Sequence, residues 1–236
     1  MKTTSRIITT LALLCPLSCG AAISLANLSS ETPDETYSAG TITGSTVDAS
    51  YSTSDVTFAF TADFGTVSAG GRVFFEFGGG AGTGTSLIVR PNGSDYEILF
   101  QHENGVNQIG GNGSSLIALV SPDTDDVEIV ASLGFTSGTE ATLNLFVGGA
   151  LVGSETGLST DWAGANDGGF DATGGGSILA ADFSNQPSFP GASTKDITYD
   201  TGLQLYSGVY VNAVPEPASV SLLGLGGIAF LLRRRK

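Results

Sequence analysis

The sequence predicts an all-β fold, an antiparallel sandwich of two sheets, with a secretory signal peptide before it and a short transmembrane helix after it. Between the two ends of the chain, most apolar runs are short and alternate with a period of two, which is the pattern of strands. Glycine is abundant, with 34 in 236 residues, and Ser, Thr, Asn and Asp fill the gaps between runs. This composition is typical of many turns. No segment between the termini shows a helical period.

About ten to twelve strands are expected in the body of the chain. In residues 55–61, for example, Val56, Phe58 and Phe60 fall on one face. The first two expected strands, 22–28 and 40–48, are placed on an outer sheet. The remaining strands are expected at residues 55–61, 72–77, 86–90, 96–100, 127–135, 140–147, 150–156, 177–182, 196–199 and 203–211.

Two hairpins are well marked. Pro91-Asn92-Gly93-Ser94 separates two of the expected strands and has Asn-Gly at its centre, which favours a two-residue turn. Gly148-Gly149 separates two later strands in the same way. Both pairs of strands are therefore expected to be antiparallel neighbours.

The chain divides into three parts, residues 1–22, 23–213 and 214–236. The first has a positive start, an apolar stretch from Ile7 to Leu17 and small residues at Gly20-Ala21-Ala22, which together indicate a secretory signal peptide. Cleavage is expected after Ala22, so the secretion translocon and signal peptidase are predicted partners. Both cysteines lie in this segment, so the mature chain is expected to have no disulfide.

The C-terminal part has three sections in order. Pro215-Glu216-Pro217 is expected to be extended and exposed, because each proline restricts its own backbone and that of the residue before it. Residues 218–232 carry no charge and form the predicted transmembrane segment. As a helix they would rise about 22 Å, less than the roughly 30 Å hydrocarbon core of a bilayer. Arg233, Arg234, Arg235 and Lys236 follow and favour the cytoplasmic side. A permanent anchor is the alternative to a removable signal.

This tail resembles the PEP-CTERM sorting signal in all three sections. The resemblance implies recognition by an exosortase, a membrane-embedded processing enzyme, with Pro215, Glu216, Pro217, Arg233, Arg234 and Arg235 as the signal residues. It also implies transient anchoring in the inner membrane and export to the cell surface or extracellular matrix of a bacterium with an outer membrane.

Charge separates the body from its ends. Residues 23–217 hold all 23 acidic residues but only three basic ones, Arg72, Arg90 and Lys195, which leaves a net charge of −20 against −14 for the whole chain. Nucleic acid is therefore excluded as a partner, because phosphate binding needs clustered Lys and Arg.

The body also resembles the laminin-G-like and concanavalin-like jelly rolls. The resemblance rests on residues 127–135 and on the apolar strand Leu143-Asn144-Leu145-Phe146-Val147 that follows a polar turn. Gly148 stands where those families usually have Asp or Asn. The expected strand at 203–211 fits the closing strand of that fold.

Two kinds of ligand are considered. Trp162 is the only tryptophan, and with Asp161 and Asn166 it is a candidate stacking platform for carbohydrate. A tryptophan that anchors a loop is an equally good reading. Calcium needs only loop oxygens, so Asp123, Asp125 and Asp126, together with Asp167 and Asp171, are candidate ligands. Acidic runs of these two kinds are more commonly solvated loops than metal sites.

The sequence offers little for catalysis. His102 is the only histidine; no nucleophile motif accompanies it, and a surface position is expected for it. Asp126 and Glu128 would share one face of a strand, but Val130 stands where a concanavalin-like glucanase has its third carboxylate. The sequence thus favours a non-catalytic surface or matrix protein that binds extracellular polysaccharide or acts structurally. The alternative is a secreted glycan-active hydrolase on the same scaffold.

Overall fold

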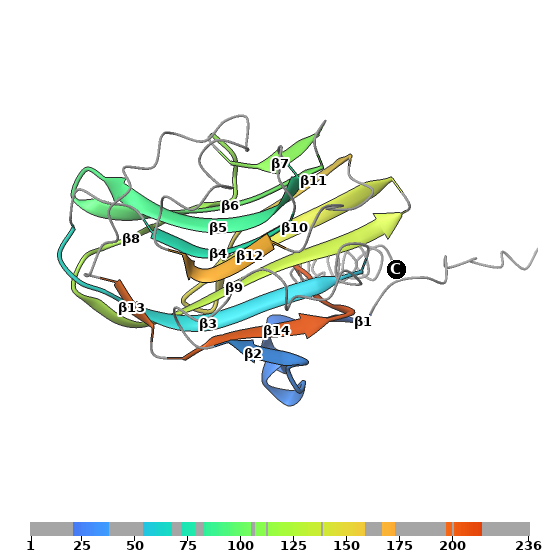
Figure 1. The fold of residues 1–236 in the computed structure, drawn as a ribbon, viewed down its shortest axis with the longest axis horizontal. Helices are drawn as coiled ribbons and strands as arrows, with labels where there is room; N and C mark the ends of the chain where they lie inside the picture. Colours follow the sequence, from blue (N-terminus) through green and yellow to red (C-terminus); the bar gives the residue numbers. More distant parts are fainter. Residues whose placement is uncertain are drawn as a thin grey trace, which may run out of the picture.

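In a computed structural model of the chain, the described residues are 21–37, 54–67, 72–78, 83–104, 107–111, 113–137, 139–158, 167–172, 197–199 and 201–213. They form two facing β-sheets, a short two-stranded parallel sheet and one short 3-10 helix, η1 (Leu25–Ser30), near the start (Figure 1). The predicted all-β sandwich of antiparallel sheets is thus confirmed, and it is consistent with a jelly-roll body. Among the described residues, no helix is long and apolar enough to cross a membrane. The predicted segment 218–232 lies outside them.

The first sheet has seven strands in the described residues, in the order β11-β10-β9-β3-β14-β2, with β13 also paired to β3. All its pairings are antiparallel. Its strands are β2 (Glu35–Tyr37), β3 (Val56–Phe64), β9 (Thr124–Ser137), β10 (Glu140–Val147), β11 (Ala150–Leu158), β13 (Ile197–Tyr199) and β14 (Leu203–Ser207).

The second sheet has six strands in the described residues, in the order β12-β4-β5-β6-β7, with β8 also paired to β6. These pairings are antiparallel too. Its strands are β4 (Arg72–Gly78), β5 (Thr83–Asn92), β6 (Asp95–Asn104), β7 (Gln108–Gly110), β8 (Ile117–Val120) and β12 (Asp167–Ala172).

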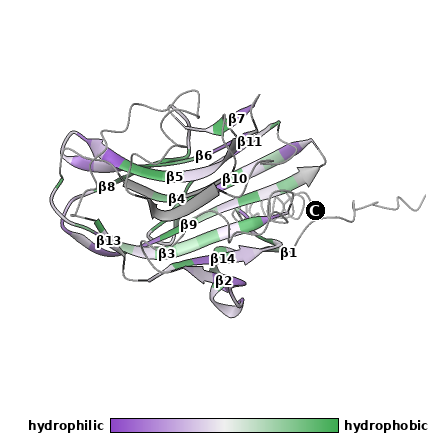
Figure 2. Ribbon diagram, in the orientation of Figure 1, coloured by the Kyte–Doolittle hydropathy of each residue, from purple (hydrophilic) through white to green (hydrophobic). Residues whose placement is uncertain are grey.

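The core lies between the sheets. Along β3, alternate residues from Val56 to Phe64 are buried and face the second sheet, where Phe58 stacks on Phe75 with ring centroids 4.2 Å apart. Figure 2 shows the same recurrence of hydrophobic residues along β3 and β9. Burial of these alternate side chains is the main force that holds the two layers together.

Both predicted hairpins are present. Gly148 and Gly149 join β10 to β11 and have φ of 59° and 76°, a backbone region that favours glycine. The β5–β6 hairpin turns at Gly93, where φ is 65°.

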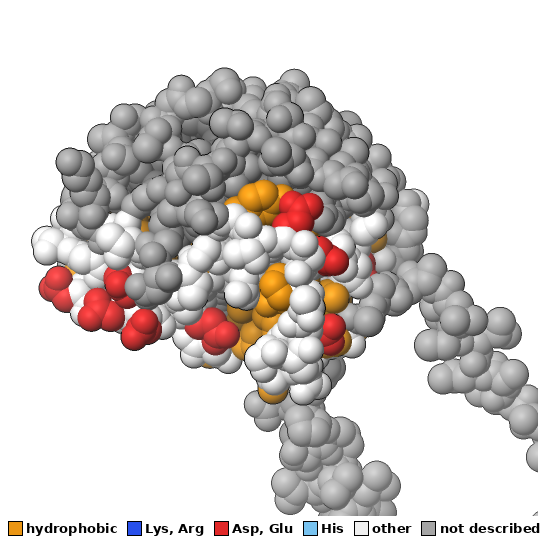
Figure 3. Space-filling model, turned by 60° about the horizontal axis from the view of Figure 1, so that its bottom comes forward, with side chains coloured by type: hydrophobic (Ala, Val, Ile, Leu, Met, Phe, Trp, Pro, Cys, Tyr) orange, Lys and Arg blue, Asp and Glu red, His pale blue; other side chains and the backbone are white. Residues whose placement is uncertain are grey.

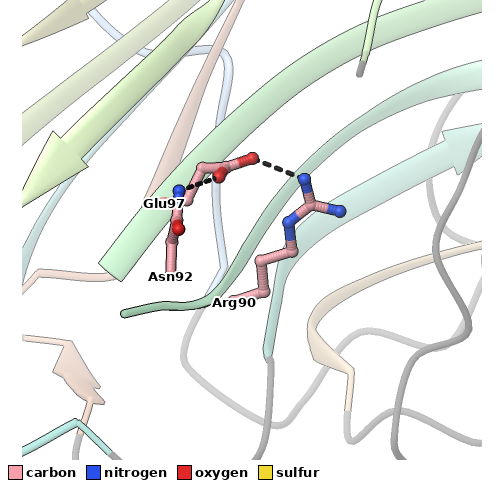
Figure 4. A network of polar contacts seen from close by, with 3 residues as sticks. All are labelled: Arg90, Asn92 and Glu97. Atoms are coloured by element: carbon pink, nitrogen blue, oxygen red, sulfur yellow. Dashed lines mark hydrogen bonds and ion pairs between the residues drawn. The ribbon is translucent and has the colours of Figure 1, made fainter. Parts of the chain in front are cut away.

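Side chains hold the turn end of the β5–β6 hairpin. An Arg90 guanidinium nitrogen lies 2.6 Å from Oε1 of Glu97, its cross-strand neighbour, and Nδ2 of Asn92 donates to Oε2 of Glu97 at 2.6 Å (Figure 4). Both carboxylate oxygens of Glu97 are therefore occupied in fixing the hairpin.

The early part of the chain differs from the expectation. Only residues 21–23 form a strand, β1, and the rest of the expected strand 22–28 is largely η1. The cause is packing: Leu28, buried with 6% of its surface exposed, turns inward onto the first sheet, and a helical turn allows this. The expected strands 40–48 and 177–182 lie outside the described residues.

The expected strand 203–211 is in fact two. Gly208, with φ of 68°, separates β14 from β15 (Val209–Val211). After this turn, β15 leaves the first sheet and pairs in parallel with β1 (Ala21–Ile23).

Candidate functional site

The strand β15 is held against the outer face of the first sheet by three buried polar side chains. Thr57, Ser132 and Asn144 are cross-strand neighbours on β3, β9 and β10, and we call them the polar row. Thr57 Oγ1 donates to Val209 O at 2.9 Å and accepts from Val211 N at 3.3 Å. Ser132 Oγ and Asn144 Nδ2 both donate to Val211 O, at 2.6 and 3.0 Å. The polar row thus satisfies the backbone of a strand that lies outside the sheet.

Tyr210 completes this attachment. Its hydroxyl is 2.6 Å from Nδ2 of Asn144, and its ring lies on Gly134. A Cβ at Gly134 would come within 2.6 Å of the ring carbon Cδ2, so only glycine leaves room for Tyr210 here.

The other end of the described chain meets β15 at the same place. Residues 21–30, which we call the N-terminal strap, comprise β1 and η1. Asn212 N donates to Ile23 O at 3.1 Å, and Leu28 packs with Phe146 and Tyr206 in a second apolar cluster, separate from the core. The two termini of the body therefore lie together on one outer face.

An open groove of about 690 Å³ runs beside the strap, and we call it the terminal groove. Leu25 and Leu28 of the strap form one wall, and the sheet supplies a largely apolar floor. Glu128 and Leu151 line it from β9 and β11, and Leu151 has 46% of its surface exposed. Its lining also includes Ala59, Phe146, Gln204, Tyr206, Asn212 and Ala213.

The polar groups of the terminal groove are uncharged or acidic. Tyr206 donates from its hydroxyl to Oε1 of Gln204 at 2.8 Å. Burial raises the pKa of Tyr206, and the nearby charge of Glu31 raises it further, so the phenol stays neutral. The buried Oδ1 of Asn212 has no hydrogen-bond partner. Figure 3 shows carboxylates around the apolar patch and no Lys or Arg among the coloured side chains of this face.

Several predicted site residues lie outside the described residues. These are the sorting-signal residues Pro215, Glu216, Pro217, Arg233, Arg234 and Arg235, the carbohydrate candidates Asp161, Trp162 and Asn166, and residues 1–20 of the predicted signal peptide. For Asp167 and Asp171 only the backbone is described, as part of β12.

The candidate calcium residues of the first acidic run are described. Asp123 and Asp126 have φ of 54° and 55°, and Asp126 N donates to Oδ1 of Asp63 at 2.8 Å. This bond ties the start of β9 to β3. Within the described ranges, no three His, Cys, Asp or Glu side chains are grouped so as to hold a metal ion.

The expectation of a surface histidine is wrong. His102 is fully buried, because β6 extends to Asn104 and His102 continues the inward alternation of Tyr96, Ile98 and Phe100. Its ring meets that of Phe135 edge-on, with centroids 6.3 Å apart. Burial lowers the pKa of His102 to about 3, so it is neutral at ordinary pH.

Sequence reasoning missed the polar row and the terminal groove. The available signal was the polar character of the outward positions in three strongly apolar strands, at Thr57, Ser132 and Asn144. Polar residues at outward positions are normally solvated, so this pattern alone did not predict a strand lying over them.

The site and the sandwich define a class: an antiparallel β-sandwich body that is followed directly by a C-terminal sorting sequence. Residues 213–236 match the PEP-CTERM protein-sorting motif, so the chain carries that motif. The match begins at Ala213, which lines the terminal groove. The motif implies export to the cell surface and processing by an exosortase-type enzyme.

Two solved structures are similar to the body at low identity. Both are of the CBM40 of an IT-sialidase from Ruminococcus gnavus. The form bound to α2,6-sialyllactose has 11% identity and a TM-score of 0.43, with 77% of this chain and 93% of that chain covered. The form bound to α2,3-sialyllactose has 13% identity and a TM-score of 0.37, with 69% and 80% covered. No curated protein matches the chain.

Proposed function

We propose that this protein is a non-catalytic surface or extracellular-matrix protein whose body binds carbohydrate and whose C-terminal motif is removed by an exosortase-type enzyme. The observation that carries the proposal is the PEP-CTERM match at residues 213–236, which starts where the described body ends. The secretory pattern of residues 1–22 supports the same route out of the cell.

The attachment of β15 supports a separable tail. The body's last strand is fixed by the polar row and by Tyr210 before the motif begins. Since none of these contacts involves residues beyond 213, loss of the motif would leave them in place.

Carbohydrate binding is proposed at the platform formed by Trp162 with Asp161 and Asn166. An aromatic face beside amide and carboxylate groups suits a sugar ring and its hydroxyls. The residue that follows this segment, Asp167, pairs with Gly78 of β4. The proposal rests on the residue types of this segment, which lies outside the described residues.

A non-catalytic role is supported by the position of His102. A Ser-His-Asp triad needs an accessible histidine that accepts a proton, whereas His102 is buried in the core and hard to protonate. Glu128 and Asp126 are exposed, and Val130 stands where a third carboxylate would be needed.

A polysaccharide array tests the binding half of the proposal. The full chain purified from its host should bind at least one extracellular polysaccharide, and Trp162→Ala should weaken that binding about tenfold or more, the scale of losing a stacking contact. Leu119→Asp, an exposed position on β8, is the control and should bind as the wild type does. Release of reducing ends that Glu128→Gln abolishes would contradict the non-catalytic role. Binding to no polysaccharide would leave a structural role in place of carbohydrate binding.

A further inference from the structure

The sorting motif has almost no free reach from the body. Ala213 lines the terminal groove and directly follows Asn212, whose N donates to Ile23 O. An extended chain spans at most about 3.5 Å per residue. Pro215 therefore lies within about 7 Å of Ala213, and Pro217 within about 14 Å. The apolar segment starts at the next residue, Ala218.

An enzyme that grips this motif must also meet the body. A specific protein interface covers about 800 Å² on each partner, a patch roughly 30 Å across. A patch of that width, centred on a tripeptide no more than about 14 Å from the groove, overlaps the groove and its rim.

The terminal groove has the chemistry of a docking surface. Its floor is apolar, and Leu151 is a large exposed side chain beside it. Glu128 gives the rim a negative charge, and the buried Oδ1 of Asn212 lacks a donor. The matching partner surface would place an apolar side chain in the groove and a basic group near Glu128.

We propose that the terminal groove is a docking surface for the enzyme that processes the C-terminal motif, so that this enzyme recognises the folded body as well as the tail. The proposal rests on the proposed function, because it needs processing to occur. The polar row suits this role: it fixes β15, and hence Ala213, in one position, so that tail and groove are presented together.

The test follows the rate of tail removal in cells of the native host, by pulse-labelling the full chain and resolving processed from unprocessed forms. Leu151→Asp removes the exposed apolar contact and should slow processing about five- to tenfold, the scale of losing one anchor of an interface. Leu119→Asp makes the same change at a side chain that is 61% exposed on β8 of the other sheet. It should be processed at the wild-type rate.

A flexible spacer between body and tail distinguishes two causes of slower processing, the loss of docking and a folding defect of the body. Ten Gly and Ser residues between Ala213 and Val214 add roughly 17 Å of flexible reach, which uncouples the tail from the groove. The spacer chain should be processed more slowly than the wild type, and Leu151→Asp should then have little further effect. As a folding control, the extracted full-length variants should resist a protease as well as the wild type does, because the fold of the body is unchanged.

Three results would overturn the proposal. One is wild-type processing of Leu151→Asp, and another is equal slowing by Leu119→Asp. The third is faster processing of the spacer chain, which would mean that the body hinders the enzyme. If the wild-type tail is never removed, the proposed function itself fails, and that outcome is distinct from these three.

Discussion

His102 lies uncharged in an apolar core, with its ring against Phe135. Its pKa of about 3 is well below the ordinary value of 6.5, because burial penalises the charged imidazolium. Below pH 6.5 the unfolded chain takes up a proton at this residue, and the folded chain does not until the pH nears 3. The stability that neutral His102 maintains is therefore fully present above pH 6.5 and is lost as the pH falls.

This gives a prediction for His102→Gln, which keeps a polar side chain but does not titrate. Between pH 6.5 and about 3, the wild type should lose up to about 1.4 kcal/mol of unfolding free energy per pH unit more than the variant does. Urea unfolding at several pH values measures this difference, and the acidic residues common to both chains cancel in it. If the unfolding free energies of the two chains changed in parallel with pH, His102 would be accessible and would titrate normally in the folded state.

At the scale of single elements, the β15 strand shows how a segment outside a sheet is kept in place. Its carbonyls and amides bond to side chains of the polar row instead of to a full ladder, and β1 is its one strand partner among the described residues. The second apolar cluster around Leu28 and Phe146 adds burial under the strap. Hydrogen bonds and burial therefore act together to fix both ends of the body.

Asn144→Ala should lower the free energy of unfolding by about 2–3 kcal/mol, because a buried side chain loses its bonds to Tyr210 and Val211 O. Thr142→Ala is a matched control: it removes a polar side chain on the same face of β10, bonded to Thr156 at an exposed position. It should change stability by no more than about 0.5 kcal/mol. Denaturant unfolding compares the two, and amide exchange at Val211 should speed up in the first alone. Equal effects would mean that β15 is not held by the polar row.

The elements divide clearly into those that the sequence predicts and those that it does not. Strands β3, β9 and β10 were predictable, because each places alternate residues in the core. The Gly148-Gly149 turn then predicts the pairing of β11 with β10. The strap was not, because Leu25 to Ser30 is too short for a period to distinguish a strand from a 3-10 turn. The break at Gly208 was also missed, since an apolar alternation continues through it from Leu203 to Val211.

The functional site, like the strands, could be predicted only where its residues are close together in the sequence. The sorting motif was recognised from its own residues, because its three sections are adjacent in sequence. The terminal groove brings together residues as distant as Leu25, Phe146 and Tyr206. Such a set is created by strand order and cannot be seen from local spacing.

At the scale of the whole molecule, the two ends of the body converge on one face of the first sheet, where Asn212 N donates to Ile23 O (Figure 1). The predicted signal peptide and the sorting motif would therefore be attached at neighbouring points on the folded body. The second sheet, with β12 at one edge, lies on the other side of the core.

The most direct test is the mass of the intact mature protein taken from the surface of its host cells, compared with protein from cells that lack the processing enzyme. The account predicts an N-terminus at Ile23 and a C-terminus near Pro217 that lacks Arg233 to Lys236, with the longer form in the cells without the enzyme. A surface protein that still ends at Lys236 would contradict it, and would make the C-terminal segment a permanent membrane anchor.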